Sequence, residues 1–145
     1  MGIQLKPIEE KYLSEIIILL QLISNFYPKK TNYKSILELF LNQKYVFGVV
    51  AIDSINNGNA EKVIGFGSLH LSRKIRGGII GFIEEIAVLE NYRGRGIGKL
   101  IMQELIDNAR NENCYKLVLE CRGEKKFFYE KLGFNCSGYS MSLIL

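Results

Sequence analysis

The sequence is poor in the residues that build disulfide-rich, zinc-binding and proline-rich proteins. Among 145 residues there are two prolines, one histidine and three cysteines. The scarcity of proline excludes collagen-like and proline-rich architectures. With no CxxC motif and a single histidine, His70, we expect no metal site. Three cysteines cannot all pair within one chain, so we expect a reducing compartment.

Long apolar runs are also missing. The longest, from Ile16 to Leu20, is far shorter than the roughly 20 residues that a membrane-spanning helix needs. Residues 1–10 lack the basic start and apolar core of a secretory signal. We therefore expect a cytoplasmic protein with no membrane partner.

The composition that remains is typical of one packed globular domain, which we expect to span residues 1–145. Hydrophobic residues make up 48% and charged residues 23%, which suits a packed core and excludes disorder. The net charge of +4 suits a small anionic ligand as well as nucleic acid. Because basic residues are interspersed with acids, we expect no nucleic-acid partner.

The order of hydrophobic patterns predicts an α/β protein with a mixed central sheet. A short strand over residues 3–8 precedes two helices, the first apolar up to Ile23 and the second capped by Thr31 or Asn32. Three strands rich in β-branched and aromatic residues then form an antiparallel meander. They cover residues 45–52, 62–71 and 79–88. A helix over 97–111, a strand over 115–121, a short helix over 124–132 and one or two closing strands over 134–145 complete the sheet and its helical cover.

The segment Arg93-Gly94-Arg95-Gly96-Ile97-Gly98 carries the clearest chemical signal. It lies between a predicted strand and a predicted helix. Its glycines let the backbone approach a ligand, and the helix start offers free amide hydrogens to an anion such as pyrophosphate. Its spacing matches neither the Walker loop nor the dinucleotide fingerprint. A glycine-rich turn that merely enters a helix is the alternative.

The pattern Arg-x-x-Gly-x-Gly between a strand and a helix resembles the acetyl-coenzyme A loop of the GNAT acetyltransferase superfamily. The order of elements agrees over most of the chain, and the segment from Phe127 to Phe134 is similar to the late helix and turn of that family. The resemblance implies a GNAT fold, acetyl-CoA as co-substrate, and direct acyl transfer without an enzyme nucleophile. The residues that it places at the coenzyme are Ile86, Ala87, Val88, Arg93, Gly94, Arg95, Gly96, Ile97, Gly98, Lys99 and Tyr129.

A narrower resemblance concerns the acceptor. The segments Glu84-Glu85-Ile86, Cys114-Tyr115-Lys116 and Leu119-Glu120-Cys121 are similar to the eukaryotic glucosamine-6-phosphate N-acetyltransferase family. In that family a tyrosine lies nine residues beyond the acid, as Tyr129 lies beyond Glu120. The resemblance implies acetylation of glucosamine 6-phosphate for UDP-GlcNAc biosynthesis, by a homodimer. It implies that Glu84 and Glu85 contact the amino sugar, that Tyr115 and Lys116 contact the sugar phosphate, and that Tyr129 serves the coenzyme sulfur.

The residues themselves allow these roles, and each also has a structural alternative. Glu84 and Glu85 interrupt an apolar strand, where they face opposite sides unless a bulge intervenes. An amine-bearing ligand is a suitable counter-ion for them. The alternative is that one of them caps a nearby helix or lies at a strand edge. Glu120 can orient an amine or accept its proton, or be a solvated strand end. Tyr129 can donate a hydrogen bond to a departing thiolate, or be a core residue.

The C-terminus departs from the family, whose last strand carries basic residues that reach the substrate phosphate across a dimer interface. Residues 140–145 hold no charge. Phosphate binding then falls to other basic residues, with Lys74 and Arg76 as candidates beside Arg73 and Arg122, or the substrate carries no phosphate. A protein N-terminus, a lysine or a polyamine is the alternative acceptor, and a coenzyme-binding module without turnover is a third possibility. His70, without a second histidine, is interpreted as structural or exposed.

Overall fold

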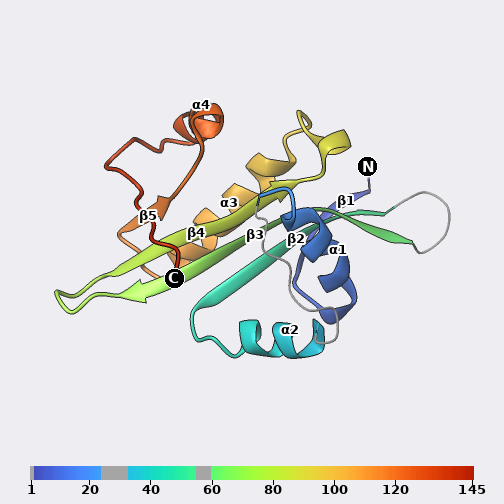
Figure 1. Cartoon of the computed structure of the whole chain (residues 1–145), viewed down its shortest axis with the longest axis horizontal. Coiled ribbons are helices and arrows are strands. Elements are labelled where there is room, and N and C mark those ends of the chain that lie inside the picture. Colours follow the sequence, from blue (N-terminus) through green and yellow to red (C-terminus); the bar gives the residue numbers. More distant parts are fainter. Residues whose placement is uncertain (1, 24–32, 55–59) are drawn as a thin grey trace.

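The computed structural model describes residues 2–23, 33–54 and 60–145. Its centre is a five-stranded sheet in the order β1-β2-β3-β4-β5 (Figure 1). The first four strands are antiparallel, and β5 runs parallel to β4. The α/β class and the mixed sheet are therefore as predicted. The strands are β1 (Ile3–Pro7), β2 (Val46–Ser54), β3 (Glu61–Arg73), β4 (Ile79–Val88) and β5 (Lys116–Leu119).

Helices cover both faces of the sheet (Figure 1). They are α1 (Leu13–Leu20), entered through the 3-10 turn η1 (Glu10–Tyr12), then α2 (Tyr33–Leu41), α3 (Ile97–Asn111) and α4 (Lys126–Lys131), with further 3-10 turns η2 (Glu90–Tyr92) and η3 (Gly123–Lys125). The helix α3 packs on one face, and α1 and α2 pack on the other. None of the helices in the described part of the chain has the length and apolar character that crossing a membrane demands.

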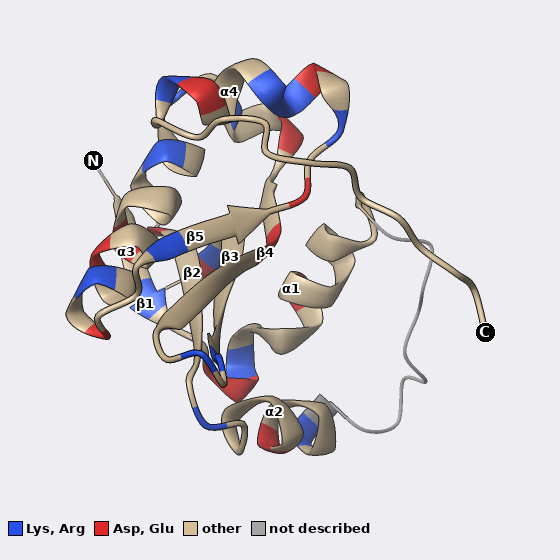
Figure 2. Cartoon of the chain, turned by 90° about the vertical axis from the view of Figure 1, so that its left-hand side faces the viewer, with Lys and Arg blue, Asp and Glu red and all other residues tan. Residues whose placement is uncertain are grey.

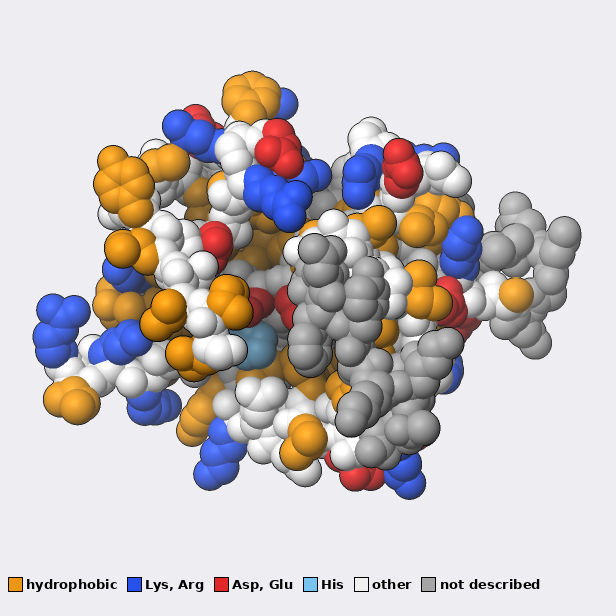
Figure 3. Space-filling view, viewed as in Figure 1, with side chains coloured by type: hydrophobic (Ala, Val, Ile, Leu, Met, Phe, Trp, Pro, Cys, Tyr) orange, Lys and Arg blue, Asp and Glu red, His pale blue; other side chains and the backbone are white. Residues whose placement is uncertain are grey.

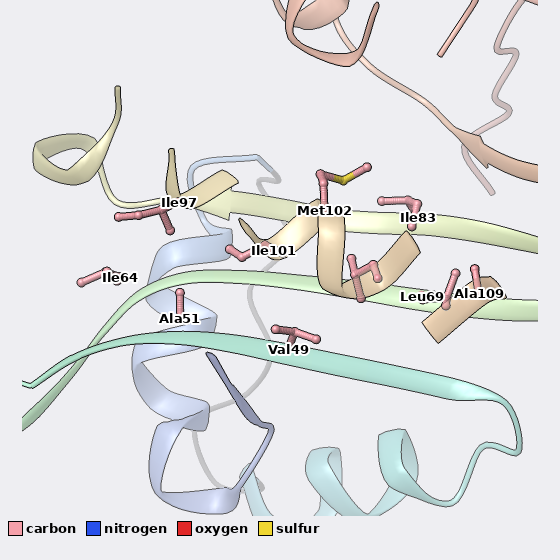
Figure 4. Close-up of a cluster of buried hydrophobic side chains, with 10 residues drawn as sticks. Val49, Ala51, Ile64, Leu69, Ile83, Ile97, Ile101, Met102 and Ala109 are labelled. Carbon is pink, nitrogen blue, oxygen red and sulfur yellow. The ribbon is translucent and has the colours of Figure 1, made fainter. Parts of the chain in front are cut away.

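Two apolar clusters hold the helices on the sheet. One side of α3 is buried because its apolar residues recur at spacings of three and four, from Ile97 and Ile101 to Leu105. They pack against β2, β3 and β4 residues such as Val49 and Leu69 (Figure 4). On the other face, α1 packs against Val50, Phe66 and Ala87, among others. The sheet is thus anchored on both sides, which holds the carboxyl ends of β4 and β5 in place.

The predicted closing strands over residues 134–145 are wrong, because these residues form no strand. A strand requires a hydrogen-bonded neighbour. Among the described residues, β5 pairs only with β4, and nothing occupies its outer edge. The apolar side chains of Tyr139, Met141, Leu143, Ile144 and Leu145 are all at least 82% exposed. The predicted caps Thr31 and Asn32 lie outside the described residues.

Candidate active site

The site forms where β4 and β5 part. These strands pair from Ile80 with Lys116 to Ile83 with Leu119. Beyond that point β4 continues through Val88 without β5, so this edge of its last five residues has no strand partner among the described residues. Ile86, Ala87 and Val88 therefore present backbone groups to a ligand on that side. Figure 2 shows α4 beyond the carboxyl ends of both strands.

A β-bulge re-aims the acidic pair of β4. The β3–β4 register changes between the Phe66–Ala87 and Ser68–Glu84 pairs, which leaves one extra residue on β4. Glu85 takes a φ of +56°, a left-handed conformation that is rare for a non-glycine residue. The bulge interrupts the alternation that would send Glu84 and Glu85 to opposite faces, and both side chains are exposed.

The two carboxylates create a local excess of negative charge. The surrounding protein raises the pKa of Glu85 by desolvation, and the charge of Glu84 raises it further, whereas His70 lowers it. Neither acid forms an ion pair with a described residue. Two carboxylates that form no ion pair with a described residue are suited to receive an ammonium group.

The glycine-rich segment after β4 forms an open loop that leads into α3. Gly94 and Gly96 have φ values of +76° and +79°, and a Cβ atom on either would meet nothing within 4 Å. Gly96 is the N-cap of α3, and no side chain caps this helix end. The first amide groups of α3 are therefore available to an anion. Arg93 braces the loop, because its Nε donates to the Val88 carbonyl at 3.2 Å.

The helix α4 packs beside this loop. A Cβ atom on Gly98 would lie 3.3 Å from the Phe128 ring and 3.8 Å from Val88, so α4 lies against the start of α3 and the end of β4. The half-buried Tyr129 ring contacts Phe128 at a centroid distance of 4.9 Å. Burial raises the pKa of Tyr129, and the charge of Cys121 adds to this. The phenol therefore keeps its proton at neutral pH and can donate it in a hydrogen bond.

Glu120 lies across the opening from the acidic pair. It directly follows β5 and is exposed to solvent. Leu119 of β5 is paired with Ile83 of β4, and the two strands are parallel. The residues that follow this pair, Glu120 and Glu84, are therefore next to each other where the two strands part. The structure thus brings Glu120, Glu84 and Glu85 to the opening between β4 and β5, as the interpretation of these residues as one site requires.

Other residues predicted for the site lie at the opposite end of the sheet. Lys116 is paired with Ile80, four residues before Glu84, which corresponds to about 13 Å along the strand. Tyr115 precedes β5 and packs its ring against Gly78. Arg76 is exposed in the turn between β3 and β4. Within one chain, therefore, these residues do not adjoin the acids.

Lys74 occupies an intermediate position. It is half-buried, and its Nζ lies 5.4 Å from the centre of the Phe82 ring. Phe82 is the β4 partner of His70, which lies two residues from Ser68 along β3. Lys74 therefore lies against the face of the sheet that carries His70.

Two further polar residues lie beside the acids: Ser68, which was not predicted for the site, and His70, which was interpreted as structural or exposed. Ser68 is fully buried and donates to the Glu84 carbonyl at 3.2 Å. The His70 Nε2 lies 3.2 Å from the Ser68 Oγ. Figure 3 shows the single histidine in a hollow of this face, with acidic side chains next to it. The available signal was the spacing of Ser68 and His70, which puts both on one face of a strand that precedes the acidic one.

Comparison with known proteins agrees with this architecture. The sequence model of the acetyltransferase (GNAT) family matches residues 16–134. A glucosamine 6-phosphate N-acetyltransferase of Trypanosoma brucei brucei is 38% identical over 86 residues, which cover 58% of this chain and 58% of that protein. Glucosamine 6-phosphate N-acetyltransferase 1 of Dictyostelium discoideum is 40% identical over 101 residues, covering 68% of this chain and 62% of the relative.

A solved structure extends the likeness to the whole fold. The crystal structure of glucosamine-6-phosphate N-acetyltransferase from Arabidopsis thaliana superposes with a TM-score of 0.85 at 25% identity, and the match covers 99% of each chain. The regions matched by sequence span 58% and 62% of the lengths of the two curated relatives.

Proposed function

This chain belongs to the acetyltransferase (GNAT) family, and on that premise we propose that it transfers the acetyl group of acetyl-CoA to the amine of glucosamine 6-phosphate. The product is N-acetylglucosamine 6-phosphate, a precursor for UDP-GlcNAc. The names of the similar proteins support the choice of acceptor. The observation that carries the proposal is the acidic pair Glu84–Glu85, which the bulge presents beside an open anion-binding loop. The acidic pair complements the positive charge of an ammonium group, and the loop complements the negative charge of a pyrophosphate.

In the proposed reaction the amine nitrogen attacks the thioester carbon directly. A C–N bond forms, the C–S bond breaks, the amine loses a proton and the thiolate gains one. Glu120 accepts the proton from the amine, directly or through water. Tyr129 donates a hydrogen bond or a proton to the departing sulfur, and its raised pKa keeps the phenol protonated until the thiolate forms. Backbone amides of Ile86 to Val88 stabilise the developing oxyanion, because this strand edge has no β5 partner.

The coenzyme is proposed to lie along the open edge of β4 and over the loop. The pyrophosphate contacts the segment from Arg93 to Lys99, where the free amides of α3 and three basic side chains coincide. The open space above Gly94 and Gly96 supports this placement. Much of the acceleration follows from holding two reactants in one geometry. No metal is required by this chemistry.

For the sugar phosphate, we propose Lys74 as a cationic contact within one chain, because it lies against Phe82, two residues before Glu84. Tyr115, Lys116 and Arg76 are about 13 Å or more along the sheet from the acids, as judged from strand spacing. These residues contribute to the phosphate only if a second subunit brings them to the site. We propose such a homodimer, supported by the exposed apolar tail and by the outer edge of β5, which pairs with no other described strand.

We further propose that residues 1–145 form one domain, because a single sheet collects strands from β1 to β5. The three cysteines are free thiols, which supports a reducing compartment such as the cytoplasm.

The test is the release of coenzyme A from acetyl-CoA with four acceptors: glucosamine 6-phosphate, glucosamine, spermidine and a peptide. A rate confined to glucosamine 6-phosphate is expected. A rate with spermidine or the peptide instead would keep the acyl transfer and refute the sugar-phosphate acceptor. Glu120→Gln is expected to reduce kcat, whereas Glu124→Gln, four residues on, serves as the matched control.

A further inference from the structure

The structure contains a hydrogen-bond chain that the proposed mechanism does not use. It runs from His70 through Ser68 to the backbone of Glu84, each link measuring 3.2 Å. It begins in the hollow seen in Figure 3 and ends at the bulge that presents the acids. These two hydrogen bonds therefore connect the His70 ring to Glu84, the first residue of the acidic pair.

The directions of these bonds define the tautomer of His70. A serine hydroxyl has one proton, and Ser68 donates it to the Glu84 carbonyl. The Ser68 oxygen can then only accept from the His70 ring. Nε2 must therefore carry the proton in the bond to Ser68. In the uncharged ring this leaves Nδ1 as a hydrogen-bond acceptor.

The packing of His70 holds the ring in this orientation. Phe40 of α2 contacts it edge-on, with ring centroids 6.1 Å apart and an interplanar angle of 87°. Ser68 is fully buried, so its hydroxyl has no solvent alternative. His70 itself is only half-buried, and no described residue donates to its Nδ1. The ring thus combines a constrained orientation with an acceptor atom that has no partner among the described residues.

From this geometry we propose that His70 is an acceptor-binding residue, and that its Nδ1 accepts a hydrogen bond from an ammonium or hydroxyl group of the amine substrate. Ser68 is a positioning residue that acts through the ring. This inference rests on the proposed acyl transfer and adds a specificity element to its acceptor side. Glu84 and Glu85 offset the positive charge of the substrate's ammonium group. His70 accepts a hydrogen bond from one substrate donor in a fixed direction.

Two variants separate the functions of the two ring nitrogens. His70→Gln places an amide near the position of Nε2 and retains the bond to Ser68, but it removes Nδ1. His70→Asn places an amide oxygen near the position of Nδ1. We expect His70→Gln to raise the KM for glucosamine 6-phosphate about tenfold and His70→Asn to raise it less. The KM for acetyl-CoA should stay unchanged in both, and Ser72→Ala on the same strand is the matched control.

A direct measurement uses the fact that the chain has one histidine. Nitrogen-15 NMR of the imidazole at about pH 8, where imidazole side chains are ordinarily uncharged, should show a protonated Nε2 and an unprotonated Nδ1. Glucosamine 6-phosphate, added in the presence of coenzyme A, should shift the Nδ1 resonance. Coenzyme A alone should not. Ser68→Ala should yield a mixture of tautomers, because the partner that selects one is gone.

The outcomes distinguish this inference from the proposed function. Turnover of glucosamine 6-phosphate without a shift at Nδ1 would overturn the role of His70 and leave the acyl transfer standing. A shift without turnover would support the binding role and overturn the proposed activity. A proton found on Nδ1 in the wild-type chain would overturn the inference whatever the kinetics.

Discussion

The protonation states of single side chains govern the two proton transfers of the proposed reaction, the loss of a proton by the amine and the gain of one by the thiolate. Burial raises the pKa of Tyr129, so the phenol remains a proton donor throughout the range in which the amine reacts. Glu85 is affected in the same direction by its surroundings, but for a carboxylate this disfavours the charged form. The site therefore includes Tyr129, which acts in its protonated form, and Glu85, which acts in its charged form although its surroundings disfavour that charge.

Tyr129→Phe removes only the phenolic hydroxyl and keeps the packing against Phe128. We expect kcat to fall by about 100-fold, with little change in either KM, because donation to the sulfur matters only as the C–S bond breaks. The alkaline limb of the wild-type kcat profile should lie above the ordinary phenol pKa of 10.0, since burial raises that pKa. Steady-state kinetics across pH measure both. Tyr45→Phe, at a partly exposed tyrosine outside the site, is the control, and an unchanged kcat in Tyr129→Phe would refute the role.

Glu85→Gln should affect stability and function in opposite directions. The folded-state pKa of Glu85 is raised above its ordinary value of 4.5, so its ionisation at neutral pH destabilises the folded state. Removing the charge should increase the free energy of unfolding at pH 7, measured in urea. It should also raise the KM for the amine, because a partner of the ammonium group is lost. Glu90→Gln, exposed in η2, should change neither, and a loss of stability in Glu85→Gln would contradict this account.

At the scale of elements, the loop between β4 and α3 depends on backbone conformation. Gly96→Ala adds a methyl group that meets no atom within 4 Å, yet the φ of +79° is unfavourable for alanine by about 1 kcal/mol. We expect the loop to relax, misaligning the amides of α3 and raising the KM for acetyl-CoA. Gly77→Ala introduces the same strain at φ +88° in the distant β3–β4 turn. It should lower stability similarly without changing that KM; equal KM effects would refute the loop as the coenzyme site.

The carboxylate of Glu61 joins β3 to β1 and η1. Hydrogen bonds from Lys6, Tyr12 and Lys11 lower the pKa of Glu61 from 4.5 to about 2. A lowered carboxylate pKa contributes stability that is present above the unfolded value of 4.5 and is lost as pH falls toward 2. Glu61→Gln should therefore flatten the decline in melting temperature over that interval, as followed by circular dichroism. Glu104→Gln, exposed on α3, should retain the wild-type slope.

Elements whose evidence is local could be predicted from the sequence. The bounds of α3 match the predicted helix over residues 97–111, because its apolar spacing and the glycine entry lie within the segment itself. For the two adjacent acids the sequence left two arrangements open, opposite faces or a bulge, and the structure has the bulge at Glu85. By contrast, the closing strand was wrong, since strand formation depends on a partner elsewhere in space. The role of Ser68 could not be predicted for the same reason, because its hydrogen bond to the Glu84 carbonyl depends on the pairing of β3 with β4.

At the scale of the whole molecule, the acidic and basic residues predicted to contact the acceptor lie toward different ends of the sheet. The acids Glu84, Glu85 and Glu120 lie at the opening between β4 and β5, and Lys116 and Arg76 lie toward the hairpin end. A small amino-sugar phosphate needs both charges close together. A second subunit that places its hairpin end near the first subunit's acids would satisfy this need, which links the acceptor proposed here to the oligomeric state.

The exposed tail makes that link testable. Tyr139, Met141, Leu143 and Leu145 alternate along the chain, so as a strand they would present one apolar face. All are at least 82% exposed in the isolated chain, and β5 has an open edge within the described residues. We expect the wild type to be a dimer by light scattering. Met141→Lys combined with Leu143→Lys should give a monomer, because charges would be buried in the interface.

The kinetic consequence decides whether the dimer matters to the site. If a partner's Lys116 and Arg76 bind the sugar phosphate, the monomeric variant should show a raised KM for glucosamine 6-phosphate and an unchanged KM for acetyl-CoA, whose proposed contacts all belong to one chain. Ser140→Lys with Ser142→Lys, on the alternate positions of the same tail, is the matched control and should remain dimeric. A monomeric wild type, or a monomeric variant with unaltered acceptor kinetics, would show that Lys74 and its neighbours within one chain suffice for the phosphate.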